Sequence, residues 1–268
     1  MVAGSARVAV AEVPGGATAE PALVEQELLG GSHWRFETSR GAVHVWTPPA
    51  YDYAGAGIVV YVHGYRTNVD RAWTEHQLAA QFLASQQNAL FIVPEAPDGL
   101  RKRVEWPSLG QLLREVRKRT GVKRPWGHVV AVGHSGAYRT LVRWLDYRHL
   151  DHIILLDGMY GNEDEFGAWL SRARGANKLI LVGADTLRWT EPFVRRHRAS
   201  QVFDLIPETL DDIAEDERRG RLLYMRSQYD HMGLVTNGKT IPVLLRLTRL
   251  SLLEAQVATV TAPGLPGE

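Results

Sequence analysis

A serine flanked by small residues follows a short apolar run near the middle of the chain. The run begins at His128 and leads directly into Gly133-His134-Ser135-Gly136-Ala137. Its β-branched residues favour a buried strand, and the apolar positions after Ala137 recur at helical spacing. A serine at such a sharp turn between strand and helix has its hydroxyl presented above the sheet. We therefore interpret Ser135 as a nucleophile.

A serine hydroxyl needs a neighbouring base to take its proton, and that base needs an acid to fix its tautomer. Four histidines follow Ser135 in the chain: His149, His152, His197 and His231. The first is expected near the end of the helix that follows Ser135, the second at the start of a strand, and the third in a basic helical run. His231 alone falls in a loop directly after the last expected strand. We expect it to be the base.

Two aspartates could supply the acid, because each ends an apolar run that is expected to be a strand. Asp157 ends His-Ile-Ile-Leu-Leu-Asp, and Asp185 follows Lys-Leu-Ile-Leu-Val-Gly-Ala. Asp185 and Thr186 precede an expected helix and have an ordinary capping explanation. A carboxylate that ends a wholly apolar strand would be costly unless it is paired. We favour Asp157 on this ground, with Asp185 as the alternative.

Acyl transfer places negative charge on the former carbonyl oxygen, which requires N–H donors. The backbone N–H of Gly136 is the first candidate. The second lies in the loop after the apolar run at 57–62, where the chain reads His63-Gly64-Tyr65. We expect the Tyr65 amide to be this donor, and we expect His63 to be a buried, hydrogen-bonded structural residue.

Apolar runs alternate with amphipathic stretches along most of the chain, which predicts an α/β fold. Near-continuous hydrophobicity in the expected strands indicates a mostly parallel, doubly wound sheet with helices on both faces. The expected strands are 42–46, 57–62, 89–93, 128–132, 152–156, 178–182 and 221–225. The expected helices are 70–87, 108–120, 136–147, 163–174, 190–199, 208–219 and 242–256. We expect one domain over residues 1–268, with loosely ordered ends at 1–22 and 262–268.

With these motifs the chain resembles the serine hydrolases of the α/β-hydrolase superfamily, from about Val43 to about Leu250. The stretch Trp46-Thr47-Pro48-Pro49-Ala50-Tyr51-Asp52 is similar to the proline-tyrosine entry of esterase-D-like enzymes. Ala137 departs from the commonest form of the motif, which has glycine there. The resemblance implies hydrolysis of an ester, thioester or amide through an acyl-enzyme, with no metal and no organic cofactor.

Composition excludes some classes and leaves others open. Lys and Arg number 31 against 30 Asp and Glu, so the bulk charge does not favour nucleic acid or an anionic membrane. The cluster Arg195, Arg196 and Arg198 is typical of a solvated helix face, and we expect no nucleic-acid partner. Without cysteine there can be no disulfide or thiol nucleophile. We expect no membrane span and no signal peptide, so the chain is cytoplasmic or is secreted with its leader absent. The sequence predicts no oligomeric state.

Substrate contacts are expected from loops at the carboxyl edge of the sheet. Arg66 follows the expected oxyanion donor, and Trp106 lies in a loop that also carries Arg101-Lys102-Arg103. We interpret Arg66 and Trp106 as substrate-binding residues, with a preference for anionic substrates as one hypothesis. The segment 158–177 holds one expected helix, too little for a large cap domain. An open pocket for a small-molecule or polymeric acyl substrate follows.

The combined prediction is a carboxylic-ester hydrolase that uses a Ser-His-Asp triad. A peptidase or amidase could use the same residues, because leaving-group choice depends on pocket shape. A non-catalytic binding protein with this fold is the alternative from another class, since fold does not guarantee activity.

Overall fold

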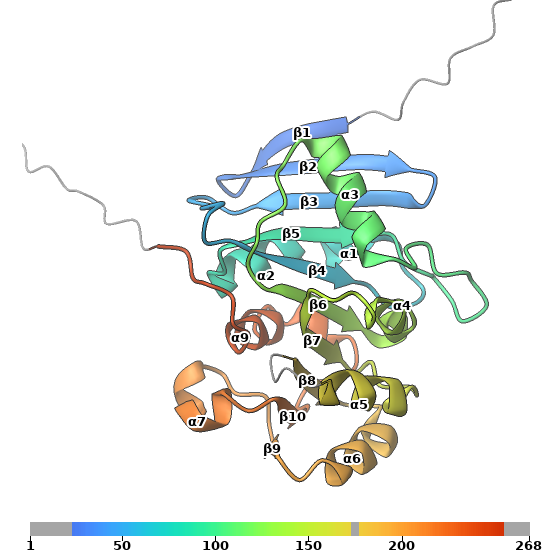
Figure 1. Ribbon diagram of the computed structural model, residues 1–268, viewed down its shortest axis with the longest axis vertical. Coiled ribbons are helices and arrows are strands. Elements are labelled where there is room, and N and C mark those ends of the chain that lie inside the picture. The colour runs from blue at the N-terminus through green and yellow to red at the C-terminus, as the bar shows by residue number, and fades with distance from the viewer. Residues whose placement is uncertain (1–22, 173–176, 255–268) are drawn as a thin grey trace, which may run out of the picture.

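The computed structural model describes residues 23–172 and 177–254. The ends expected to be loosely ordered, residues 1–22 and 262–268, lie outside these ranges. The described residues form a ten-stranded sheet with helices on both faces (Figure 1). This is the α/β architecture that the sequence predicts.

The strand order is β1-β2-β3-β5-β4-β6-β7-β8-β10-β9. The pairings from β1 to β5 are antiparallel, and every pairing from β5 onward is parallel. The carboxyl ends of the parallel strands therefore meet along one edge of the sheet. The bounds are β1 Leu23–Leu28, β2 Gly31–Thr38, β3 Gly41–Thr47, β4 Gly57–Val62, β5 Ala89–Pro94, β6 Val129–His134, β7 Leu150–Leu156, β8 Lys178–Gly183, β9 Ser200–Phe203 and β10 Leu222–Arg226.

All seven expected strands are confirmed, each within about two residues at its ends. The strands β1, β2 and β9 were not expected. β1 reads Leu-Val-Glu-Gln-Glu-Leu and is exposed along most of its length, and β9 is partly exposed at the other edge. Edge strands of this kind lack the apolar run that marks a buried strand.

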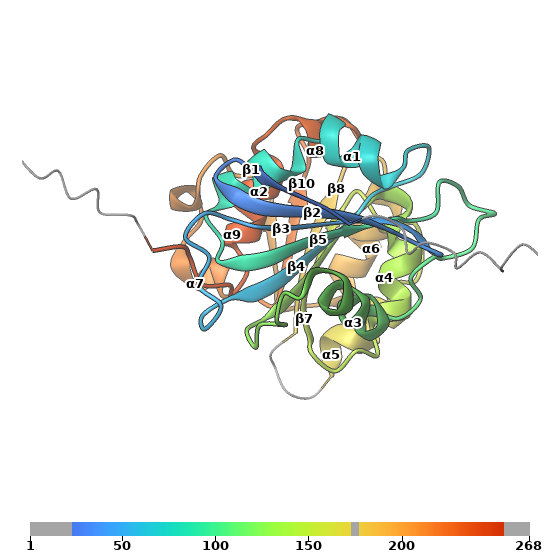
Figure 2. The same ribbon diagram turned by 90° about the horizontal axis from the view of Figure 1, so that it is seen from above.

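The helices cover the sheet in two layers, which Figure 2 shows from above. One apolar layer packs under α3, α4, α5 and α6, and the other packs under α1, α2, α8 and α9. The bounds are α1 Val69–Glu75, α2 Leu78–Ser85, α3 Leu109–Thr120, α4 Tyr138–Trp144, α5 Glu163–Ser171, α6 Leu187–Arg196, α7 Glu215–Arg218, α8 Gly233–Thr236 and α9 Thr240–Arg246, with 3-10 turns at Ser135–Ala137 and Leu210–Asp212.

Three expected helices differ from the structure by more than about three residues or in their number. The helix expected over 70–87 is two helices, because Gln77 has a left-handed backbone with φ +49° that interrupts it. The stretch 208–219 forms a 3-10 turn and the short α7 instead of one helix. The last helix ends at Arg246, and residues 255–256 of its expected range lie outside the described part. The short α8 was not expected.

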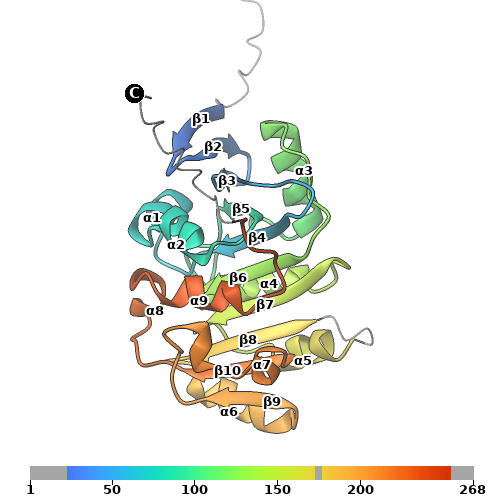
Figure 3. The same cartoon turned by 90° about the vertical axis from the view of Figure 1, so that its left-hand side faces the viewer.

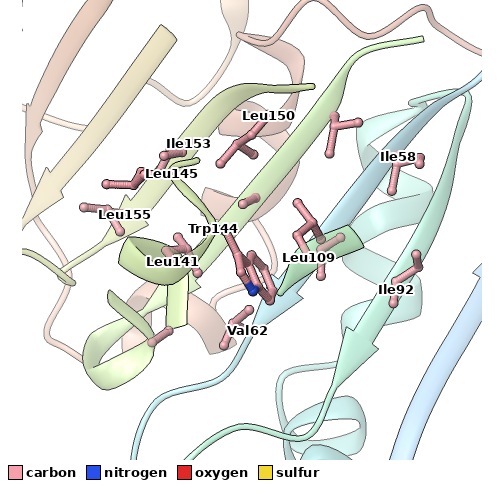
Figure 4. Close-up of a cluster of buried hydrophobic side chains, with 14 of the residues drawn as sticks. Ile58, Val62, Ile92, Leu109, Leu141, Trp144, Leu145, Leu150, Ile153 and Leu155 are labelled. Carbon is pink, nitrogen blue, oxygen red and sulfur yellow. The ribbon is translucent and has the colours of Figure 1, made fainter. Parts of the chain in front are cut away.

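A cluster of buried side chains fixes α4 to the sheet below it (Figure 4). The Trp144 indole is 1% exposed and packs among residues of α3, β4 and β7. Its Nε1 donates a hydrogen bond to the Trp106 carbonyl at 2.7 Å. Aromatic side chains of this size contribute a large share of buried area, so α4 has a rigid base.

The described part of the segment between β7 and β8 contains α5 and no larger unit. No helix in residues 23–172 or 177–254 combines the length and the apolar character that a bilayer crossing requires.

Candidate active site

Ser135 lies at the point where β6 ends and α4 is about to begin. Its φ is +53°, a left-handed conformation that costs a non-glycine residue roughly 1–3 kcal/mol. Two glycines allow the tight turn. A Cβ at Gly133 would lie 2.9 Å from Leu141, and a Cβ at Gly136 would overlap with the Tyr65 ring. The turn therefore leaves little room for a side chain at positions 133 and 136.

Ala137, where the commonest motif has glycine, fits without strain. Its φ of −59° and ψ of −23° are ordinary right-handed helical values, which any L residue adopts. The residue is fully buried and begins the turn into α4. The departure from the common motif therefore leaves the geometry of the turn intact.

Asp157 follows β7 at the same edge of the sheet and is fully buried, with a φ of +46°. Its Oδ1 accepts hydrogen bonds from the Ala184 N–H at 2.9 Å and from the N–H and Oγ1 of Thr186 at 2.9 and 2.7 Å. Its Oδ2 accepts from the Asp185 N–H at 3.1 Å. The turn after β8 thus forms a cradle of donors around this carboxylate.

The same Oδ2 lies 2.6 Å from Nδ1 of His231. Burial opposes ionisation of Asp157, but the hydrogen bonds from His231 and Thr186 outweigh it and hold the pKa of the carboxyl well below its usual range. In return, the hydrogen bond to Asp157 raises the pKa of His231 above its ordinary value, against the effect of burial. Because Nδ1 faces the carboxylate, Nε2 is the nitrogen that remains for proton transfer.

Asp185 contributes its backbone rather than its side chain to this cradle. The residue is exposed, and its carboxylate raises the pKa of His231 only as a nearby charge. The structure therefore brings Asp157 and His231 together, and it leaves Asp185 beside them.

His134 contacts both the backbone and the ring of His231, which the sequence did not predict. Its ring is 3% exposed, and its Nε2–H donates to the His231 carbonyl oxygen at 3.0 Å. The two ring centroids are 4.6 Å apart. Burial lowers the pKa of His134 to about 3, so the ring is neutral at physiological pH. Its position immediately before the serine was the one available signal.

The loop after β4 lies against the serine. A Cβ at Gly64 would be 2.8 Å from the Ser135 Cβ, so only glycine allows this approach. The Tyr65 ring lies directly on Gly136. The two residues with the expected oxyanion amides are therefore neighbours beside Ser135. His63 is fully buried, with Nδ1 2.7 Å from the Gly64 carbonyl and Nε2 2.9 Å from Glu95, in agreement with its expected structural role.

A row of aromatic rings begins at the serine, and this too was missed. The Tyr160 hydroxyl lies near the Ser135 side chain, which opposes the larger effect of burial on the pKa of this phenol. The Tyr160 ring lies 6.2 Å from Tyr138 and 5.3 Å from Trp189, and Arg188 stacks on Trp189 at 3.7 Å. All three rings are partly exposed. The Tyr160 ring is inclined by 37° to Tyr138 and by 60° to Trp189, so the three rings form an angled aromatic cluster near the nucleophile.

The two expected substrate-binding residues lie in different surroundings. Arg66 is exposed and lines a surface cavity of about 480 Å³ at the carboxyl edge. Trp106 is 2% exposed and packs in the apolar layer under α3 and α4. A ring so buried has no face for a substrate, because the loop turns back into the core. We therefore do not retain Trp106 as a binding residue.

Asp157, Asp185 and His231 offer three possible metal ligands within 4.8 Å of one another. The chemistry of the cradle argues against a cation, however. Both Asp157 oxygens already accept hydrogen bonds, and a cation would face the N–H donors of Ala184 and Thr186. Such a set of donors suits a carboxylate that pairs with a histidine.

Comparison with known proteins identifies structural neighbours only. No family model and no curated protein sequence matches the chain. A feruloyl esterase module from Clostridium thermocellum, in complex with sinapinate, is 13% identical over 85% of this chain and 89% of its own, with a TM-score of 0.52. A protein abbreviated FAE is 14% identical with the same coverage and a TM-score of 0.54. An S-formylglutathione hydrolase from Agrobacterium tumefaciens is 12% identical over 87% of this chain and all of its own, with a TM-score of 0.51.

The chain has the α/β-hydrolase fold. In this fold, a serine on a strained turn between strand and helix is presented at the top of the sheet. Ser135, the Asp157–His231 pair and the Gly64-Tyr65 loop all lie at that edge. At these identities the likeness concerns the fold alone.

Proposed function

We propose that this protein is a serine hydrolase that cleaves a carboxylic ester through an acyl-enzyme. The observation that carries the proposal is the 2.6 Å contact between Asp157 and His231 at the edge where Ser135 adopts its strained turn. The buried, ionised carboxylate holds Nδ1 of the imidazole, so that Nε2 is the base for the serine.

In the first step the Ser135 oxygen attacks the ester carbonyl carbon as its proton passes to His231 Nε2. The negative charge that develops on the carbonyl oxygen is stabilised by the amides of Gly136 and Tyr65. The bond to the alcohol then breaks, and His231 returns the proton to the leaving oxygen. Water, activated by the same imidazole, hydrolyses the acyl-serine and regenerates the enzyme.

The surroundings of Ser135 favour an ester with a flat aromatic group. Tyr160, Tyr138 and Trp189 form a partly exposed aromatic cluster near the nucleophile, and an aromatic ring packs well against such rings, offset-stacked or edge to face. One structural neighbour, a feruloyl esterase module, holds sinapinate. The segment between β7 and β8 is short and its described part holds only α5, so we expect the site to be accessible to a group attached to a larger molecule. Arg66 remains a candidate for binding a negative group at the rim.

Labelling with a fluorophosphonate probe tests the nucleophile. We expect stoichiometric labelling of the protein, complete loss in Ser135→Ala, and no loss in Ser39→Ala, which changes an exposed serine. Absence of labelling in folded protein would instead favour a binding protein. Labelling that persists in Ser135→Ala would refute the assignment of the serine.

A substrate series tests the leaving group and the acyl group. We expect p-nitrophenyl esters to be hydrolysed and the corresponding anilides to be inert, because an amide has a poorer leaving group. Among methyl esters, aromatic acids should give a higher kcat/KM than aliphatic acids of similar size. Comparable turnover of anilides would favour the peptidase or amidase alternative.

A further inference from the structure

A second cavity lies at the opposite edge of the sheet, where the parallel strands begin. It has a volume of about 420 Å³ and is lined by Lys178, Glu215, Arg218, Arg219, Arg246, Leu247, Thr248 and Arg249. Figure 3 looks onto the side of the molecule on which α7 and α9 lie, the two helices that contribute to its walls. In Figure 1 they are on the left, whereas α4, which follows Ser135, is on the right.

The cavity is unusual in its charge. Five lining residues are cationic and one, Glu215, is a carboxylate. That carboxylate already forms an ion pair with Arg219. Among the described residues, Lys178, Arg218 and Arg246 form no ion pair. Like charges so close together repel one another, so the cavity as described favours a negative ligand.

The surroundings of Lys178 are the strongest evidence for a negative ligand in this cavity. The residue is 2% exposed, although it opens into this cavity. Its ammonium donates to the Arg218 carbonyl, one neutral acceptor for a group with three donors. Burial and the charge of Arg249 lower the pKa of Lys178 to about 8. A buried cation is normally paired with an anion, and within the described part of the chain this one has no such partner.

The neighbouring strand adds a second underused donor. His152 is the cross-strand partner of Lys178 and is fully buried. Its Nδ1 accepts a hydrogen bond from the Arg249 N–H at 3.3 Å, so the proton of the neutral ring is on Nε2, which has no partner among the described residues. The cavity and its immediate surroundings are therefore rich in donors and poor in acceptors.

We propose that this cavity binds a small phosphate-bearing ligand, separate from the catalytic centre. Guanidinium groups match phosphate oxygens in pairs, and a group with two or more negative charges fits several cations better than a single carboxylate does. The volume exceeds that of inorganic phosphate, so the ligand has room for an organic portion. β8 runs from Lys178 to Gly183, which separates the two sites by about 17 Å along the strand.

Calorimetric titration with pyrophosphate and with inorganic phosphate tests the site, at constant ionic strength and with acetate as the carboxylate comparison. We expect saturable binding to one site, with pyrophosphate tighter than phosphate and acetate the weakest. Arg246→Gln should weaken pyrophosphate binding about tenfold or more, the size of one lost charged hydrogen bond. Its esterase activity should be unchanged, because Arg246 lies far from Ser135.

Arg117→Gln is the matched control, because Arg117 lines another arginine-containing surface cavity with Arg114 and Arg124. We expect its pyrophosphate affinity to stay within about twofold of the parent protein. Equal weakening in both variants would show nonspecific attraction to basic surface and overturn the proposal. Absence of saturable binding in the folded parent protein would overturn it as well.

Lys178→Met gives an independent readout. An unpaired buried charge carries a desolvation cost that an apolar side chain does not, so the variant should melt at the same temperature or higher in phosphate-free buffer. It should also lose the stabilisation that pyrophosphate gives the parent protein. If the melting temperature of Lys178→Met still rises with pyrophosphate as much as in the parent, the ligand binds elsewhere.

Discussion

Asp157 and Asp185 lie within a few ångströms of each other, yet their side chains differ in every property that matters for catalysis. Asp157 is fully buried, accepts hydrogen bonds on both oxygens and contacts His231 at 2.6 Å. Asp185 is exposed and acts on His231 only through its charge. The two residues can therefore be separated by substitution.

We expect Asp157→Asn to lower kcat by about 10³- to 10⁴-fold, because an amide can hold the imidazole in the wrong tautomer. Asp185→Asn should change kcat by less than about threefold, as for an ordinary exposed residue. Steady-state hydrolysis of one p-nitrophenyl ester by both variants decides this. Similar modest losses in the two would contradict the assignment of Asp157.

The pH profile distinguishes this role from a purely structural one. His231 must be neutral to accept a proton, so kcat/KM falls as pH drops through its pKa. The hydrogen bond to Asp157 raises this pKa above the ordinary 6.5. In Asp157→Asn that bond to a charge is lost while burial remains, and the acid limb of the residual activity should move to lower pH. An unmoved limb would indicate that Asp157 only maintains the fold.

At the scale of elements, the hairpin of β1 and β2 is joined to α1 by a chain of hydrogen bonds. The Gln26 amide donates to His33 Nδ1 at 3.0 Å, His33 Nε2–H to His44 Nδ1 at 2.9 Å, and His44 Nε2–H to Asp70 at 2.8 Å. The Trp73 ring stacks on both imidazoles. In each of the two imidazole rings Nδ1 accepts a hydrogen bond and Nε2–H donates one. A ring with one accepting nitrogen is neutral, so both histidines are neutral.

His44→Leu should lower the free energy of unfolding by about 2–3 kcal/mol, because it removes the central link and leaves the buried N–H of His33 without an acceptor. Urea denaturation measures the change. His149→Leu, a substitution at a partly exposed histidine, should change stability by less than about 0.5 kcal/mol. Equal effects of the two substitutions would mean that the chain of hydrogen bonds adds no stability.

The hairpin also shows where sequence reasoning ends. Buried strands such as β4 and β6 are visible as apolar runs, but β1 has Glu-Gln-Glu at its centre and has no such signal. The break at Gln77 depends on one left-handed backbone conformation that no residue type announces. The difference between the Asp157 and Asp185 side chains depends on the direction of the N–H groups in the turn after β8. The burial of the Trp106 ring depends on a loop that turns inward. These are tertiary properties.

At the scale of the whole molecule, buried histidines dominate the response to acid. Burial lowers the pKa of His33 and His76 to about 4, and that of His134 and His152 to about 3. All four lie on the face of the sheet that α1, α2, α8 and α9 cover, and they are spread from β2 to β7. Unfolding exposes them to water, where their ordinary value is 6.5.

Stability should therefore fall steeply as pH drops below about 6.5. Between that value and 4 the unfolded chain binds protons that the folded chain does not, and each such histidine costs about 1.4 kcal/mol per pH unit. His231 acts in the opposite sense, since its raised pKa favours the folded state at acidic pH and this contribution is lost as pH rises through that pKa. The lowered pKa of Asp157 stabilises the fold over this whole range, and this contribution is lost only at much lower pH.

Urea denaturation from pH 8 to pH 4.5 should therefore show a maximum in the free energy of unfolding close to neutrality. On the acid side, the slope of this free energy against pH should correspond to the uptake of more than one proton per molecule on unfolding. His76→Gln should reduce this slope by up to one proton. If the parent protein is equally stable at pH 7 and pH 5, these rings are accessible to protons in the folded state, which would contradict the prediction.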